Sequence, residues 1–318
     1  MANEEKKYIF PLTGDSADIY KEFINRLALL HQKHPELLKT TLANIFTMRS
    51  IGNKTHGDMA EIGLTEFINK FLYDYRCEHV GKINFRHKDK EEDIEVLSEI
   101  KKEHFKISLK AYGEGPLQLS TDKVDKVQDG LFRRILDLRG NSNASPQEKI
   151  DEIYNLPNFI NLTYILPIIY RENEKGGECN IMIFDIEKAQ KETKYIYYIK
   201  KEHQFDKQLK KVVKENKAKK RKRKYPIYLF LNEKYEYICE VRYGGKDANA
   251  LQRGIWTDSK KASRYFSCFE EKWIKYERQD QLIDLFAHAL NSSPTSHIEA
   301  DKILISDITK RIPEKDNG

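Results

Sequence analysis

Two segments near the middle of the chain carry polar side chains on a strand-like pattern. In "DIEVLSEI" (93–100) and "FKISLKAY" (105–112), apolar residues alternate with acidic, serine and lysine residues. An alternation of period two predicts β-strands with one apolar and one polar face. The short connection "KKEH" between the segments predicts that they form a hairpin.

The polar face of this hairpin gathers side chains that can do chemistry. With the turn centred between residues 101 and 102, we expect Asp93 opposite Lys110 and Glu95 opposite Ser108. Carboxylates hold a hard cation such as Mg²⁺, which lowers the pKa of a bound water, and a neighbouring lysine can orient that water. With a further acid from a preceding helix, for which Glu61 is the candidate, the set suits metal-assisted hydrolysis of a phosphodiester.

Each of these side chains also has a simpler interpretation. An aspartate opposite a lysine forms an ordinary cross-strand ion pair, and Glu61, Glu95 and Ser108 taken singly are typical of a solvated surface. Their coincidence, with a helix and a hairpin in this order, is what favours a catalytic site.

Three motifs and the order of elements resemble a known family. The motifs are "GDMAEIGLTEFINKF", "EEDIEV" and "FKISLKAYGEGPLQLST". They are similar to motifs of the PD-(D/E)xK nuclease superfamily, and in particular of type II restriction endonucleases, over residues 58–171.

The resemblance implies both a fold and a site. The fold is α/β with a mixed α+β sheet: a restriction-endonuclease-like core in which a central mixed β-sheet is flanked by helices, with N-terminal helices and a C-terminal α+β extension. In the site, Asp93 and Lys110 would flank a Mg²⁺ ion and Glu61 would join them. The family places an acid two residues before the lysine, where this chain has Ser108. Glu95 is the first candidate to replace that acid, and Glu61 is the second.

The hydrophobic pattern also predicts how the chain is organised. We expect an N-terminal helical region (1–50), the nuclease core (51–200), a basic helix or connector (201–225) and a C-terminal part with a hairpin and helices (226–318), although one continuous domain is also compatible with the pattern. Further predicted elements are helices at 16–38, 120–138, 207–220 and 268–290, a helix beginning in 247–256, strands at 80–86, 161–170 and 180–186, and a hairpin at 225–245.

Several polar side chains are of the types that contact DNA. Arginine, asparagine and glutamine read base edges by paired hydrogen bonds, and lysine binds phosphates. Each of the candidate residues named next could instead be a solvated surface residue or make a structural hydrogen bond without contacting DNA. The candidates are Gln118, Lys123, Arg242, Asn249, Gln252 and Arg253. The run "KAKKRKRK" (217–224) can attract phosphates, act as a nuclear address or serve as a solvated connector.

Composition limits the location of the protein. The 318 residues carry a net charge of +6 and contain no apolar run long enough for a membrane span. The N-terminus "MANEEKKYIF" lacks the basic and apolar regions of a signal peptide, so we expect a cytoplasmic protein with no membrane partner. The four cysteines show no CxxC spacing and are expected to be free thiols.

The sequence thus leads to one functional expectation and two alternatives. We expect a Mg²⁺-dependent endonuclease that cuts double-stranded DNA at a short palindromic site within a restriction–modification system, with a cognate DNA methyltransferase as its functional partner. The resemblance implies a homodimer with one active site per strand. The alternatives are a structure-selective repair or junction nuclease and a non-catalytic DNA-binding protein with a degenerate nuclease core.

Overall fold

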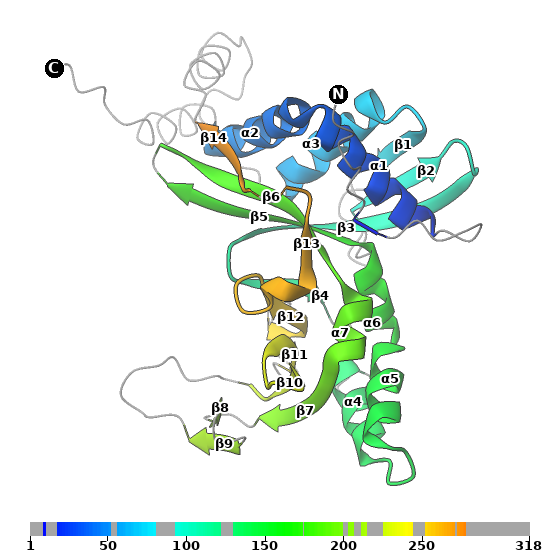
Figure 1. Cartoon of the computed structure of the whole chain (residues 1–318), viewed down its shortest axis with the longest axis vertical. Coiled ribbons are helices and arrows are strands. Elements are labelled where there is room, and N and C mark those ends of the chain that lie inside the picture. Colours follow the sequence, from blue (N-terminus) through cyan, green and yellow to red (C-terminus); the bar gives the residue numbers. More distant parts are fainter. Residues whose placement is uncertain are drawn as a thin grey trace, which may run out of the picture. The chain divides into compact units, whose positions relative to one another are not determined.

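The computed structural model describes residues 9–10, 18–51, 56–80, 93–121, 130–173, 175–199, 203–206, 211–214, 225–243, 252–270 and 272–277. Over these ranges the protein is of the mixed α/β type, with a mixed central sheet flanked by helices (Figure 1). The expected fold class is confirmed at this level.

The chain divides into two compact units, each assembled from separate stretches. Unit 1 comprises residues 1–111, 170–180 and 269–318, and unit 2 comprises residues 112–169 and 181–268. The sequence predicted four regions that follow one another along the chain, whereas each unit combines stretches that are far apart in the sequence. Three of the four boundaries between the units fall inside strands, namely β3 (Glu103–Gly113), β5 (Ile165–Asn173) and β6 (Gly176–Phe184), and the fourth follows residue 268.

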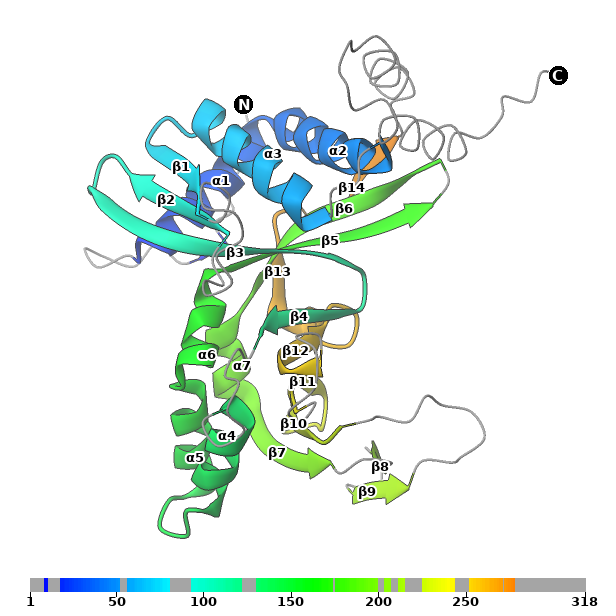
Figure 2. The same cartoon turned by 180° about the vertical axis from the view of Figure 1, so that it is seen from behind.

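Unit 1 begins with the helices α1 (Ile19–Lys33), α2 (Pro35–Ile51) and α3 (His56–Phe71). Asp18 caps α1, because its side chain accepts the backbone N–H of Tyr20 at 3.0 Å. The sequence predicted one helix over 16–38, but α1 ends before Pro35, since a proline disfavours helical geometry in the residue before it. Helices α2 and α3 pack side by side (Figure 1, Figure 2).

Helix α3 leads into an antiparallel arrangement of β1 (Tyr75–His79), β2 (Ile94–Ser98) and β3. The strand expected at 80–86 lies, apart from residue 80, outside the described residues, because residues 81–92 are not described. Strands β2 and β3 confirm the expected hairpin.

The register of this hairpin differs from the expected one by two residues. Glu95 pairs with Lys106 rather than with Ser108. The turn occupies residues 99–102, and Lys102 closes it with a φ of 57° while its N–H donates to the carbonyl four residues earlier at 2.8 Å. A shift of two residues leaves every side chain on its expected face.

Seven strands within the described ranges form the central sheet, in the order β1-β2-β3-β5-β6-β13, with β14 also pairing with β6. Strands β5 and β6 confirm the buried strands expected at 161–170 and 180–186, although residues 161–164 form a short 3₁₀ helix. The helix expected at 268–290 is wrong at its start, where the chain forms β13 (Phe266–Cys268) and β14 (Ile274–Glu277). Alternate residues of β14 are buried, which is the pattern of a strand.

Unit 2 contains a second sheet whose five strands, counted over the described ranges, are ordered β4-β12-β11-β10-β7 and are all antiparallel. The hairpin expected at 225–245 is confirmed by β10 and β11. Strand β12 occupies the end of the helix expected in 247–256, because Gly254 opens an extended segment there. The bounds are β4 (Pro116–Ser120), β7 (Thr193–Ile199), β10 (Ile227–Asn232), β11 (Tyr237–Arg242) and β12 (Gly254–Asp258).

Helices lie along one face of this five-stranded sheet. Phe132 stacks on Tyr228 of β10 with ring centroids 4.4 Å apart, and Phe159 lies 5.5 Å from Phe230 of the same strand. Because side chains alternate along a strand, Ile227 and Leu229 point to the opposite face. The helices of unit 2 are α4 (Leu131–Gly140), α5 (Pro146–Tyr154), α6 (Pro157–Ile160) and α7 (Ile186–Glu192). Helix α4 is the end of the helix expected at 120–138, of which residues 122–129 are not described.

Two short strands follow β7. β8 (His203–Asp206) pairs antiparallel with β9 (Lys211–Lys214). The polar helix expected over 207–220 is therefore wrong at β9, where two adjacent valines favour a strand. None of the helices described above is both long and apolar enough to cross a membrane.

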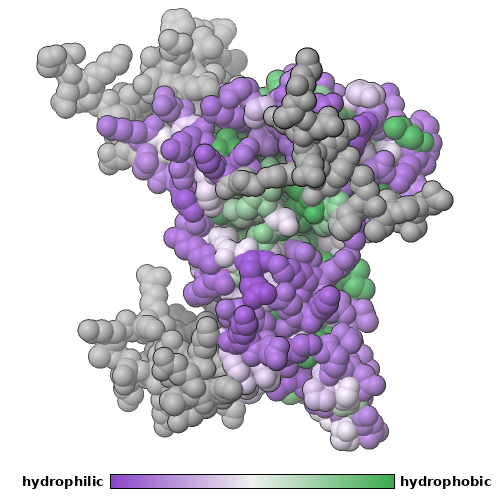
Figure 3. Space-filling model, in the orientation of Figure 1, coloured by the Kyte–Doolittle hydropathy of each residue, from purple (hydrophilic) through white to green (hydrophobic). Residues whose placement is uncertain are grey.

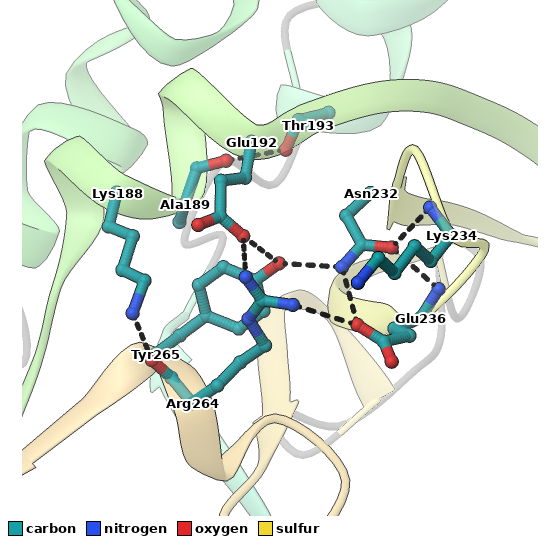
Figure 4. A network of polar contacts seen from close by, with 9 residues as sticks. All are labelled: Lys188, Ala189, Glu192, Thr193, Asn232, Lys234, Glu236, Arg264 and Tyr265. Carbon is teal, nitrogen blue, oxygen red and sulfur yellow. Dashed lines mark hydrogen bonds and ion pairs between the residues drawn. The ribbon is translucent and has the colours of Figure 1, made fainter.

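A polar network holds the β10–β11 turn of unit 2 (Figure 4). Asn232 donates to Glu236 at 2.8 Å and to the hydroxyl of Tyr265 at 3.2 Å, and that hydroxyl donates to Glu192 at 2.9 Å. Arg264 bridges both carboxylates, at 2.7 Å from Glu192 and 2.9 Å from Glu236. Burial raises the pKa of Tyr265 to about 12, so its hydroxyl keeps the proton that it donates. Both carboxylates are thus paired, and the network serves the turn.

Candidate functional site

The strongest candidate site lies where β2 begins beside β3, in unit 1. Asp93 immediately precedes β2, and its backbone N–H donates to the carbonyl of Ile107 at 3.0 Å. One carboxylate oxygen of Asp93, Oδ2, accepts the backbone N–H of Leu109 at 2.6 Å and the hydroxyl of Ser108 at 3.1 Å. Two donors on one oxygen fix the orientation of the carboxylate.

Lys110 follows on the same side of β3 as Ser108, because side chains two residues apart share a face. It is half-buried and makes no hydrogen bond or ion pair with any residue in the described part of the chain. The register places Asp93 beside Ser108, so the expected position of Asp93 directly opposite Lys110 is wrong by two residues. The expected common face of the three residues is retained.

Glu95 does not stand beside Ser108. It pairs across the hairpin with Lys106, and its Oε1 atom lies 3.5 Å from the Nδ1 atom of His104. The expected position of Glu95 directly across from Ser108 was therefore wrong, because the turn is centred one residue earlier than expected and this shifts the pairing by two residues.

Glu61 lies on α3, which runs alongside β1. One turn later, Thr65 contacts the buried sulfur of Cys77 at 3.8 Å, and Asn69 bonds the backbone N–H and carbonyl of Cys77 at 2.8 and 2.9 Å. The helix and β1 run in opposite directions, so going back one turn to Glu61 moves toward the end of β1. That end is tied to Asp93, whose carbonyl accepts the N–H of Val80 at 3.1 Å.

These acids do not form a ready-made metal cluster. Across the described residues, no group of three His, Cys, Asp or Glu side chains lies close enough to hold a metal ion. Ser108 is only 8% exposed, so its place on β3 is inside the fold rather than on the surface. A hydroxyl there supplies a hydrogen bond to Asp93 but no negative charge.

The structure separates the expected DNA-contacting residues. Gln118 on β4 is buried, and its amide donates to the carbonyl of Arg253 at 2.7 Å. This agrees with the alternative that Gln118 makes a structural hydrogen bond. Gln252 and Arg253 are half-buried immediately before β12. Lys123 and Asn249 lie outside the described residues.

Arg242, at the end of β11, has a defined setting in unit 2. Its Nε atom donates to Oε1 of Glu240 at 2.7 Å, and its guanidinium carbon lies 3.7 Å from the ring centroid of Trp256. Burial raises the pKa of the Tyr112 hydroxyl, and the positive charge of Arg242 opposes this rise. Sequence reasoning missed Glu240, although its position two residues before Arg242 puts both on one face of a strand.

The surface of unit 2 is mostly hydrophilic over α7, β7 and the neighbouring strands in the view of Figure 3. Searches against protein-family models, curated proteins and solved structures found no match to this chain.

Proposed function

We propose that the chain is a metal-dependent endonuclease that hydrolyses double-stranded DNA at a short palindromic site. The observation that carries the proposal is the fixed carboxylate of Asp93, with Lys110 on the same face of the hairpin. The order of elements and the motifs that resemble the PD-(D/E)xK superfamily support it.

In this proposal Asp93 holds a Mg²⁺ ion, and Glu61 supplies the second carboxylate from α3. Magnesium prefers carboxylate oxygens and keeps several waters, so two acids are enough to hold it against a phosphate. The bound ion supplies an acidified water and neutralises charge on the phosphodiester. Ser108 keeps the Asp93 carboxylate in place for this role.

Lys110 would position the attacking water and stabilise the negative charge that develops on the phosphate. A lysine with no ion-pair partner among the described residues is available for that task. The net charge of +6 suits a polyanionic substrate.

The biological setting follows from the resemblance. Cutting both strands of a palindrome is most simply achieved by a C2 homodimer with one site per strand. A restriction–modification system in the cytoplasm, with a cognate DNA methyltransferase, is the corresponding context.

A second candidate is a non-catalytic DNA-binding protein with a degenerate nuclease core. Two observations favour it: Ser108 stands at the position of an acid, and the described residues bring no three metal-binding side chains together.

The test is digestion of unmethylated plasmid and bacteriophage DNA with the purified protein and Mg²⁺, beside EDTA. Asp93→Ala and Lys110→Ala are expected to abolish the discrete fragments. Lys106→Ala is the matched control, because this lysine is on the same strand and the same face but faces Glu95. Fragments that persist in EDTA or in Asp93→Ala would overturn the proposed site. Binding without cleavage would favour the degenerate core, and cleavage confined to branched DNA would favour a structure-selective nuclease.

A further inference from the structure

Building on the proposed DNA substrate, we propose that Arg242 binds the O6 and N7 acceptors of one guanine and so reads one base pair of the recognised sequence. Arginine donates to this pair of acceptors through two parallel N–H bonds, which is the commonest base-specific contact in protein–DNA complexes. What distinguishes Arg242 from the other basic residues of unit 2 is how its guanidinium is held.

Two contacts fix the plane of this guanidinium. The indole of Trp256 lies against it, 3.7 Å from ring centroid to guanidinium carbon, and Glu240 accepts from Nε at 2.7 Å. Stacking fixes the tilt of the group, and the bond to Nε fixes its rotation within the plane. The side chain therefore enters a complex with little conformational entropy left to lose.

The contact with Glu240 uses the Nε atom of Arg242, so the fork formed by the two terminal nitrogens of the guanidinium is left to donate to a ligand. Within the described part of the chain, neither terminal nitrogen of Arg242 has a hydrogen-bond partner. The side chain is 18% exposed, so it is partly open to solvent. A ligand with two adjacent acceptors can meet both nitrogens at once.

Charge favours a base edge over a phosphate. Glu240 is buried, with its side chain 5% exposed, and its negative charge offsets the positive charge of Arg242. A neutral pair attracts a phosphate weakly over distance. Hydrogen bonds to the neutral acceptors of a base depend on well-oriented donors rather than on net charge. The two terminal nitrogens of Arg242 remain such donors when its charge is offset by Glu240.

Neighbouring side chains on this face do not offer the same fork. Cross-strand pairing sets Glu240 beside Trp256 and Trp256 beside Gln118, so the three lie in one row across the sheet. The amide nitrogen of Gln118 already donates to the carbonyl of Arg253, and Gln118 is buried. Arg242, which lies on the same face of β11 as Glu240, therefore offers a fork that these three side chains do not.

The experiment first selects bound sequences from random DNA duplexes with the full-length protein in EDTA, so that binding is measured without cleavage. Each guanine of the selected sequence is then replaced singly by 7-deazaguanine, which removes the N7 acceptor and keeps Watson–Crick pairing. We expect one position to bind about 5- to 150-fold more weakly. In Arg242→Met, which has no donor for the base edge, the same replacement is expected to have no effect.

Arg171→Met is the matched control. Arg171, in unit 1, also lies over a tryptophan, 4.0 Å from the ring centroid of Trp273, and donates to a glutamate, Glu178, at 3.2 Å. It is expected to retain the guanine preference of the wild-type protein.

Three results would overturn the inference: a selected sequence without guanine, no position sensitive to 7-deazaguanine in the wild-type protein, or the same sensitivity in Arg242→Met. A phosphate contact would instead make Arg242→Met weaken all duplexes alike and reduce the salt dependence by about one ion. A wild-type protein that does not respond to 7-deazaguanine overturns the inference even if the variant fails to fold. Guanine selection without cleavage would leave this inference standing while the catalytic proposal fails.

Discussion

The hydroxyl of Ser108 donates a hydrogen bond to the carboxylate of Asp93 at 3.1 Å. Ser108 stands where the PD-(D/E)xK superfamily, which the motifs of this chain resemble, has a second acid. Ser108 is buried, so a charge introduced there has little contact with water. This pair therefore allows the proposed metal site to be tested through stability as well as through activity.

Ser108→Asp is expected to lower the free energy of unfolding in EDTA by about 2 kcal/mol or more, because it buries a second negative charge beside the first. Mg²⁺ is expected to restore much of this loss, since a cation between two carboxylates removes their repulsion. Thermal unfolding in EDTA and in Mg²⁺ measures both effects. Ser108→Asn is the neutral control and should respond no more to Mg²⁺ than the wild-type protein. Equal responses of the two variants would exclude Asp93 as a metal ligand.

The four cysteines should differ in reactivity. Burial raises the pKa of Cys77 and of Cys179 to about 12, and it also raises the pKa of the buried Cys239. A raised pKa keeps these thiols protonated, and therefore unreactive, at mildly alkaline pH. Cys268 is exposed. A disulfide reagent should label one thiol in the native protein and four after unfolding, and mass spectrometry should locate the native label at Cys268. Rapid native labelling of Cys239 would contradict the fold of unit 2.

The start of α5 supports a prediction about helix capping. The hydroxyl of Ser145 accepts the N–H of Glu148 at 3.2 Å, and the carboxylate of Glu148 accepts the N–H of Ser145 at 2.6 Å. Ser145→Ala should lower the free energy of unfolding by about 1 kcal/mol, whereas Ser145→Thr should retain the cap. Urea unfolding measures this difference.

The same cap should depend on pH. Its hydrogen bonds lower the pKa of Glu148 in the folded state. The contribution of the carboxylate is therefore complete above its unfolded pKa and is lost as the pH falls through its folded pKa. The difference in free energy of unfolding between the wild-type protein and Ser145→Ala should therefore become smaller in acid. A difference that becomes larger in acid would contradict the lowered pKa of Glu148.

Gln118 should behave as a structural residue. Gln118→Met removes one of two donors to the carbonyl of Arg253, the other being the indole N–H of Trp256, and should lower the free energy of unfolding by about 1 kcal/mol. The bound DNA sequence should stay the same in this variant. Gln147→Met, at an exposed position on α5, is the control and should change stability by less than about 0.5 kcal/mol. If Gln118→Met selected a different DNA sequence from the wild-type protein, Gln118 would contact a base rather than act only in the fold.

The sequence predicted the faces of the hairpin but not its register. Alternation of period two is unchanged when a strand slides by two residues, so the pattern placed Asp93, Ser108 and Lys110 on one face in either case. The register was decided by the turn, where Lys102 adopts a left-handed conformation that its residue type does not signal. The separation of Glu95 from Ser108 followed from this turn.

The contacts of Arg242 were less accessible to sequence reasoning. Arg242 and Glu240 are two residues apart on one strand, but Trp256 comes from β12, after a segment that was expected to start a helix. The position of Trp256 depends on pairing between β11 and β12, and no local pattern specifies that pairing. Trp256 itself is buried.

The division into units has a consequence for how this protein can change. The chain passes between the units after residues 111, 169, 180 and 268. No single cut releases either unit as one continuous polypeptide, and a fragment ending near residue 200 would lack strands of both sheets. A gene fusion therefore cannot transplant unit 2 while leaving unit 1 intact. A new specificity for the proposed DNA substrate would therefore have to arise through individual substitutions, such as those at Arg242, rather than through exchange of a whole unit.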